Sequence, residues 1–212
     1  METVRRIYPL GGIVYAVAVL AAYGVVSGDS PNIDASPSEI ASFYGDETGA
    51  EQAAALLIAF GAPFLALFTV ALWKALAPAA PERSGAATMA LVGGAVAVSG
   101  ILAQAGVHLA LAEGADEGVE PVALQALSTL DEDIFLVAAA GLGILLLGSA
   151  GAILGRGALP RWLGWSALAI GALSFTFAAF QAFVLAHAWV VIASVVLVAR
   201  GSRSPAPAPP VS

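Results

Sequence analysis

The sequence predicts an all-α integral membrane protein, a bundle of six transmembrane helices with short helices in two outer loops. Hydrophobic residues make up 59% of the 212-residue chain and charged residues only 11%, whereas a soluble domain is about half apolar and about a quarter charged. So few ionic side chains cannot cover a water-facing surface. The separation of basic from acidic segments gives the number of spans.

Basic and acidic residues occupy different segments of the chain. Thirteen of the fifteen acids lie in residues 28–51 and 113–133. Positive loops stay in the cytoplasm, so six spans with both termini cytoplasmic place every basic residue on the inner side of the plasma (inner) membrane, whereas five spans would put Arg200 and Arg203 outside. The eight basic residues form four pairs that flank apolar segments: Arg5 and Arg6, Lys74 and Arg83, Arg156 and Arg161, Arg200 and Arg203.

The six expected spans belong to one domain, residues 1–203. The last two come from a single stretch without charge, Trp162–Ala199, which would be about 57 Å long as one helix, against a bilayer core of roughly 30 Å. Two short spans with a turn near Phe180–Ala182 fit this length and return Arg200 to the side of Arg161. The spans are residues 7–27, 52–76, 88–112, 134–154, 162–180 and 183–199, and residues 204–212 are expected to be a disordered proline-rich tail.

The first span begins after a basic start, which is also seen in signal peptides. Because no A-x-A-like site follows the apolar run, we expect a span that is not cleaved. Pro63 falls near the middle of the second span, where proline frees a backbone carbonyl and kinks a helix. A static kink and a hinge of a transporter are both consistent with this position.

Short helices are expected in both outer loops. Ser36–Glu39 has the form of a capping box with Pro37 at the first helical position. Thr48–Glu51 repeats the T-x-x-E form and is expected to begin the second span. In the second loop we expect a short helix over Pro121–Leu130, with Ser128 capping the helix that follows.

Small residues recur at a spacing of seven in several spans, which places a smooth stripe along each helix. Such stripes allow neighbouring helices to approach closely, within this chain or in a homo-oligomer or a complex with another membrane protein. The residues are Gly93 and Gly100; Gly141, Gly148 and Gly155; and Gly164, Gly171 and Ala178.

The chain resembles a family of uncharacterised multi-pass bacterial membrane proteins of actinobacterial type. The resemblance rests on a basic start followed by Pro9–Gly12, on the loop Asp34–Ala41, and on Leu159–Trp165 before the fifth span. It implies the six-span architecture and no particular activity.

His108 and His187 are the ionisable side chains within the expected spans, and such groups at membrane depth are functional candidates. Both are expected about one turn below the outer surface. Gln104, Gln181, Asp131 and Asp133 would lie near them. These residues are candidates for a polar or ligand site, which would suit proton transfer, a divalent metal or a haem between the histidines; the alternative is that each histidine makes ordinary hydrogen bonds by itself.

No motif supports catalysis or a resident cofactor. The chain has no cysteine, no G-x-S-x-G, and neither H-x-x-x-H nor H-E-x-x-H, so we expect no metal and no catalytic residue. Nucleic-acid binding is excluded by the few basic residues, and the expected partner is the lipid bilayer. We expect a structural, accessory or sensing component of the membrane. A transporter or channel for a small solute or ion is the alternative.

Overall fold

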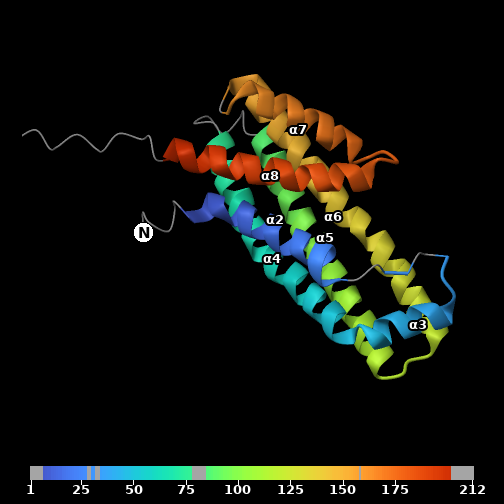
Figure 1. The fold of residues 1–212 in the computed structure, drawn as a ribbon. Coiled ribbons are helices and arrows are strands. Elements are labelled where there is room, and N and C mark those ends of the chain that lie inside the picture. Colours follow the sequence, from blue (N-terminus) through green and yellow to red (C-terminus); the bar gives the residue numbers. More distant parts are fainter. Residues whose placement is uncertain (1–6, 28–29, 32–33, 78–84, 158, 202–212) are drawn as a thin grey trace, which may run out of the picture.

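The computed structural model describes residues 7–27, 30–31, 34–77, 85–157 and 159–201, which form a bundle of helices (Figure 1). No strand occurs among these residues, and the predicted all-α class is confirmed. In chain order the elements are the 3₁₀ turn η1 (Tyr8–Leu10), α2 (Gly11–Ala21), the π-helical turn η2 (Ala22–Val26), α3 (Pro37–Asp46), α4 (Thr48–Leu76), α5 (Gly85–Asp116), α6 (Pro121–Arg156), α7 (Arg161–Leu173) and α8 (Ala179–Gly201).

Five helical segments of the described chain are long and apolar enough to cross a membrane. They are Tyr8–Val26, Thr48–Leu76, Gly85–Asp116, Pro121–Gly155 and Ala179–Arg200. The remaining predicted span, residues 162–180, ends as a helix at Leu173. Thirteen helical residues reach about 20 Å, which is less than the bilayer core. Five of the six predicted spans therefore form helices of sufficient length, and the six-span arrangement itself stays a prediction.

The turn between α7 and α8 lies at residues 174–178, earlier than the predicted Phe180–Ala182. Thr176 supplies side-chain hydrogen bonds to this turn, which has neither glycine nor proline. Its hydroxyl donates to the carbonyl of Leu173 and accepts from the backbone N–H of Ala178 at 3.1 Å. Ser and Thr commonly stabilise turns with such local bonds to the backbone. α7 and α8 pack side by side, so Arg161 and Arg200 lie at the same end of the hairpin (Figure 1).

The second predicted outer helix is part of one continuous helix, α6, which has 36 residues. Ser128 is buried within α6 and does not cap a new helix. Neither glycine nor proline interrupts the chain between Pro121 and Gly141, so nothing breaks the hydrogen-bonding pattern. α6 is about 54 Å long, and it therefore extends well beyond a bilayer core at one end.

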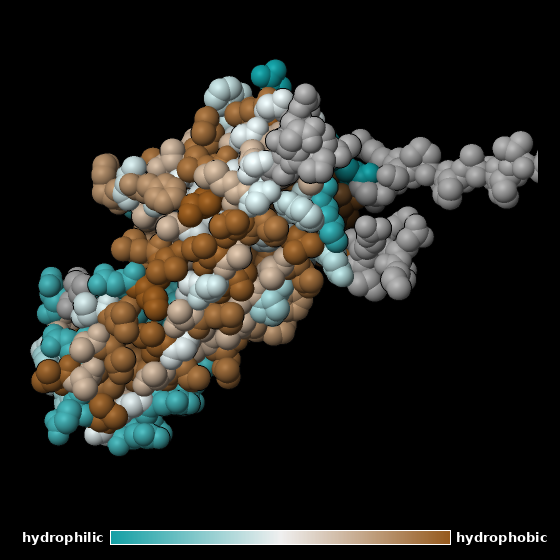
Figure 2. Space-filling view, turned by 180° about the vertical axis from the view of Figure 1, so that it is seen from behind, coloured by the Kyte–Doolittle hydropathy of each residue, from teal (hydrophilic) through white to brown (hydrophobic). Residues whose placement is uncertain are grey.

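The molecule has two charged poles separated by an apolar belt. The acidic pole is α3 together with the adjoining ends of α4, α5 and α6, and Figure 1 shows these three helices continuing past the α7–α8 turn. The basic pole is the opposite end, which carries Lys74, Arg161 and Arg200. Figure 2 shows apolar surface over the middle of the molecule and hydrophilic surface at the acidic pole. This distribution is the one expected of a membrane protein.

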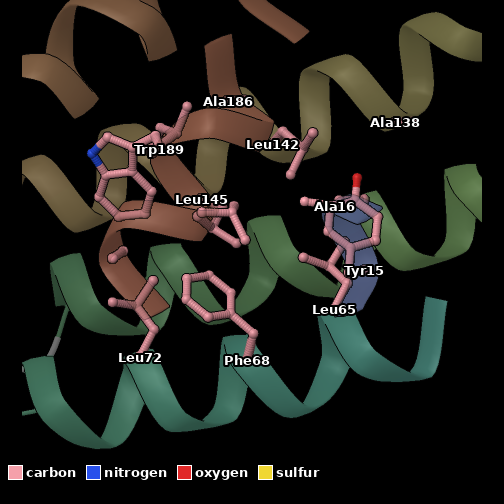
Figure 3. Packing of buried hydrophobic residues seen from close by; sticks show 14 of the residues in the cluster. Tyr15, Ala16, Leu65, Phe68, Leu72, Ala138, Leu142, Leu145, Ala186 and Trp189 are labelled. Atoms are coloured by element: carbon pink, nitrogen blue, oxygen red, sulfur yellow. The ribbon is translucent and has the colours of Figure 1, made fainter. Parts of the chain in front are cut away.

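Glycines bring α5 and α6 into backbone contact. A Cβ on Gly93 would overlap Leu145, one on Gly100 would lie 2.5 Å from the nitrogen of Ala138, and one on Gly148 would overlap Ala90. Apart from exposed Gly155, the seven-residue stripes of these two helices therefore face each other inside the chain. Leucine and aromatic side chains of α2, α4, α6 and α8 fill the rest of the core (Figure 3).

α3 covers the acidic pole and is connected directly to α4. Its capping box is present as predicted, with reciprocal bonds between Ser36 and Glu39. One residue, Glu47, separates α3 from α4, and the Thr48 hydroxyl donates to the carbonyls of Tyr44 and Gly45 at 2.7 and 3.0 Å. We call this connection, residues 44–48, the elbow.

Candidate functional site

The core face of α4 begins with an acidic residue. Glu51 lies in the first turn, and the spacing of Ala54, Ala55, Ile58 and Leu65 places all of these residues on the same buried side of the helix. Glu51 is completely buried. A carboxylate is favourable near a helix N-terminus because the helix dipole is positive there, but a buried carboxylate also needs hydrogen-bond donors.

His108 on α5 links Glu51 to Asp131 on α6. Its Nε2 lies 2.8 Å from Glu51 Oε2, and its Nδ1 lies 2.8 Å from Asp131 Oδ2. The side chain of His108 is 5% exposed and that of Asp131 is 14% exposed. The imidazole therefore spans three helices, with one carboxylate at each ring nitrogen. We call Glu51, His108 and Asp131 the acidic cluster.

Two further elements enclose this cluster. Ser27, just after η2, directs its hydroxyl at both carboxylate oxygens of Glu51, at 3.1 and 3.0 Å. The ring of Tyr44 on α3 meets His108 edge-on, with 6.0 Å between ring centroids. Burial raises the pKa of the Tyr44 hydroxyl, and the nearby carboxylates of Asp131 and Glu51 raise it further, so this hydroxyl keeps its proton.

The acidic cluster lies where the apolar belt ends. Leu56 on α4, Leu102 on α5 and Leu136 on α6 are large apolar side chains with 61%, 48% and 54% exposure, which marks the belt. Each lies five or six residues from its cluster member towards the basic pole, about 8 to 9 Å along the helix. The cluster is thus inside the protein at the boundary between the belt and the acidic pole.

The structure brings some of the candidate residues from the sequence together and leaves others on the surface. His108 and Asp131 are in contact, and buried Gln104 lies one turn below His108 on α5. Asp133 and Gln181 are exposed on the surface.

His187 lies apart from His108 and has different partners. It is stacked on Tyr15 of α2, with 4.9 Å between the ring centroids, and its Nδ1 is 2.8 Å from the carbonyl of Phe183. It stands eight residues beyond the start of α8, about 12 Å along the helix, because the turn comes earlier than the sequence indicated. Pro63 lies within the continuous helix α4 and is exposed, and its role as a hinge stays a prediction.

The acidic cluster is arranged in a line. The two carboxylates lie at opposite nitrogens of one ring, so the three groups do not converge on one point as metal ligands do. No set of three or more His, Asp or Glu side chains suited to a metal ion occurs in the described part of the chain. A haem between the two histidines does not fit either, since both nitrogens of His108 face carboxylates. The arrangement suits the binding and release of protons.

Glu51, Ser27 and Tyr44 were not among the candidates from the sequence. The signal for Glu51 was present, since α4 begins at Thr48 and the spacing of Ala54, Ala55 and Ile58 puts Glu51 on the apolar face. The approach of Ser27 and Tyr44 depends on how the chain returns between α2, α3 and α4, and no local pattern indicates it. Comparisons of the chain with protein-family models, with curated proteins and with solved structures found no match.

Proposed function

We propose that this chain is a non-enzymatic, multi-pass protein of the bacterial plasma membrane that senses pH at its acidic pole. The observation that carries the proposal is the imidazole of His108, with Glu51 at one ring nitrogen and Asp131 at the other. Histidine changes charge near physiological pH more readily than any other side chain. Here that change would act on contacts between three helices.

Two hydrogen bonds to one imidazole require two protons. With both present, His108 is an imidazolium between two carboxylates, or a neutral ring beside one carboxyl group that holds the second proton. If one proton leaves, a bare ring nitrogen faces a carboxylate oxygen at 2.8 Å, and the two lone pairs repel each other. Loss of a proton therefore breaks the link from α5 to α4 or to α6.

The proton is expected to enter and leave on the Asp131 side. Asp131 is 14% exposed, whereas Glu51 is fully buried. Two tyrosines lie beside the acidic cluster, Tyr44 from α3 and Tyr23 from η2, and Tyr23 faces Asp131. Exposed Glu132 on α6 interacts electrostatically with Asp131, Asp133 and Asp34, so further negative charge lies on the outer side of the cluster. Tyr44 stays protonated, as its raised pKa indicates, so it covers the ring of His108 without competing for the proton.

The proposal predicts that α3 and α6 move relative to each other as the pH rises. The chain has no cysteine, so the exposed residues Ser42 on α3 and Ala126 on α6 can be replaced by cysteine and spin-labelled as a unique pair. In lipid nanodiscs we expect a narrow distance distribution at low pH and a broader or longer one once His108 has lost its proton.

The variants His108→Gln and His187→Gln form a matched pair for this test. Glutamine can donate to only one of the two carboxylates and does not titrate. The variant His108→Gln should therefore show the broader or longer distribution of spin-label distances at every pH. His187→Gln should keep the transition of the wild type. A distance that does not change with pH in the wild type, or a transition that survives in His108→Gln, would overturn the proposal.

Transport of a small cation or proton is the second candidate, and Glu51 is the feature that favours it. A fully buried carboxylate at the membrane boundary is a group that a cation can use. Against transport stands the direct backbone contact of α5 with α6 through Gly93, Gly100 and Gly148, which leaves no space between these helices. Flux into proteoliposomes that is lost in Glu51→Gln would favour transport over sensing.

The proposed topology has both termini in the cytoplasm. It is supported by the positive-inside rule, because Lys74 is in the last turn of α4, Arg161 begins α7 and Arg200 is in the last turn of α8. These helix ends lie at the basic pole (Figure 1). In this topology α7, the turn at 174–178 and α8 together form the last hairpin in the membrane. Membership of the uncharacterised bacterial family stays a prediction, as does association with a second copy or another membrane protein. The stripe on α7 packs against α6 within the chain, because a Cβ on Gly164 or on Gly171 would meet atoms of α6 at about 3 Å.

A further inference from the structure

Tyr15 on α2 and His187 on α8 form a second polar pair inside the bundle, separate from the acidic cluster. Both side chains are completely buried. Their rings stack at 21° with 4.9 Å between centroids, and Phe183 meets His187 edge-on at 4.4 Å. Exposed Val17 on α2 and exposed Val184 on α8 lie in the same stretches, so the pair is inside the apolar belt.

The hydrogen bonding of His187 fixes the roles of its two nitrogens. A carbonyl oxygen only accepts, so the contact of 2.8 Å between Nδ1 and the carbonyl of Phe183 places a proton on Nδ1. In the neutral ring Nε2 then carries a lone pair and can only accept. Nε2 is buried and has no hydrogen-bond partner among the described residues.

The hydroxyl of Tyr15 is the matching donor. It is also buried without a hydrogen-bond partner in the described structure. Figure 3 shows it pointing from α2 away from Leu65 of α4. An unpaired donor and an unpaired acceptor on two stacked rings are both unfavourable in a membrane interior, because no solvent compensates them. Their hydrogen-bonding capacities are complementary.

We propose that Tyr15 and His187 hold one small neutral hydrogen-bonding molecule, a water, between the tyrosine hydroxyl and Nε2. Water donates to Nε2 and accepts from Tyr15 at the same time, and a buried water typically makes two to four such bonds. Both rings have no exposed surface, so a lipid headgroup cannot reach them. The proposal does not depend on the pH-sensing role of the acidic cluster.

The test uses the fact that the chain has only two histidines. In a His108→Gln background, ¹⁵N-labelled histidine reports on His187 alone, and the result is independent of the acidic cluster. We expect the ¹⁵N chemical shift of His187 Nε2 to be that of a hydrogen-bonded acceptor, and we expect a cross-peak between Nε2 and a water proton. Tyr15→Phe should weaken both, and Tyr8→Phe on the neighbouring turn should leave both unchanged. The proposal would be overturned if Nε2 of His187 carried a free lone pair with no contact to water. It would also be overturned if Tyr15 donated directly to Nε2 with no water between them.

The direction of the stability change gives a second, independent test. If water is bound, Tyr15→Phe leaves it with one partner fewer, and the unfolding midpoint in mixed micelles should fall. If the pair is dry, the same substitution removes an unsatisfied group and the midpoint should rise. The background carrying His108→Gln serves again as the reference, and a rise in the midpoint contradicts the proposal.

Discussion

Replacing Gly100 by alanine tests the contact between α5 and α6 most directly. The new Cβ would lie 2.5 Å from the nitrogen of Ala138 and 2.9 Å from the Cα of Ala138 and the carbonyl carbon of Val137. Comfortable contacts between such atoms need about 3.5 Å, so the two helices would have to separate by about 1 Å. Backbone atoms cannot rotate away, and we therefore expect a loss of about 2 to 3 kcal/mol, the upper part of the range for overpacked cores.

Gly106→Ala on the same helix is the matched control. Gly106 is exposed, and a Cβ there would meet no atom within 4 Å. Alanine is favoured over glycine within a helix by about 0.5 to 1 kcal/mol, so this variant should be unchanged or slightly more stable. The two variants should therefore differ by about 3 kcal/mol.

The free energy of unfolding can be measured by titrating the purified protein with sodium dodecyl sulfate in mixed micelles and following helicity and tryptophan fluorescence. If Gly100→Ala is as stable as Gly106→Ala, the backbone contact does not hold α5 against α6. The same result would mean that α5 and α6 can accommodate an added methyl group. The argument that their contact leaves no space for a transport path would then fail.

Two further predictions concern the acidic pole and the α7–α8 hairpin. The backbone N–H and the hydroxyl of Ser36 both donate hydrogen bonds to Glu39, and these bonds lower the pKa of its carboxyl. The contribution of Glu39 to stability is therefore complete above the ordinary pKa of glutamate and is lost as the pH falls through the lowered pKa. The difference in unfolding free energy between the wild type and Glu39→Gln should disappear on acidification, and a difference that persists at low pH would contradict this. Trp189 donates a bond of 3.0 Å to the carbonyl of Leu163, so Trp189→Phe should lose about 1 to 3 kcal/mol of unfolding free energy, whereas the exposed Trp165→Phe should change it by less than about 0.5 kcal/mol.

The membrane class and most helices could be predicted from the sequence because they depend on local properties. Apolar segments of sufficient length and the separation of Lys and Arg from Asp and Glu are readable residue by residue. The capping box at Ser36–Glu39 is likewise a local signal, and it is present as predicted. The glycine stripes predicted close helix packing but not the pairing of α5 with α6.

The predictions of the second outer helix and of the last turn were wrong because a local sequence signal was consistent with two structures. Ser128 looked like a cap, but without a glycine or proline beside it the helix continues and Ser128 is buried in its interior. The turn before α8 has no glycine or proline either, and Thr176 bonds to the carbonyl of Leu173 and to the N–H of Ala178 within it. This earlier turn moves His187 away from the boundary where it was expected.

The candidate site was predictable only in part. His108 and Asp131 were candidates because they are polar groups at the ends of apolar segments. Glu51 was expected only as part of the motif that begins the second span, although its spacing from Ala54 and Ile58 puts it on the core face once α4 begins at Thr48. The contact between Glu51, His108 and Asp131 depends on the tilt and axial register of three helices. Neither quantity can be inferred from a short stretch of one sequence.

The elbow connects the buried acidic cluster to the outside of the acidic pole. Thr48 is bonded to two carbonyls of α3, and Glu51 follows one turn later on α4, so we expect a shift of Glu51 to be passed to the adjoining end of α3. The opposite end of α3 is tied to α6, because Gln125 donates a hydrogen bond to the carbonyl of Ala35. A partner that contacts the elbow from outside would therefore respond to the protonation of the acidic cluster without touching the cluster itself.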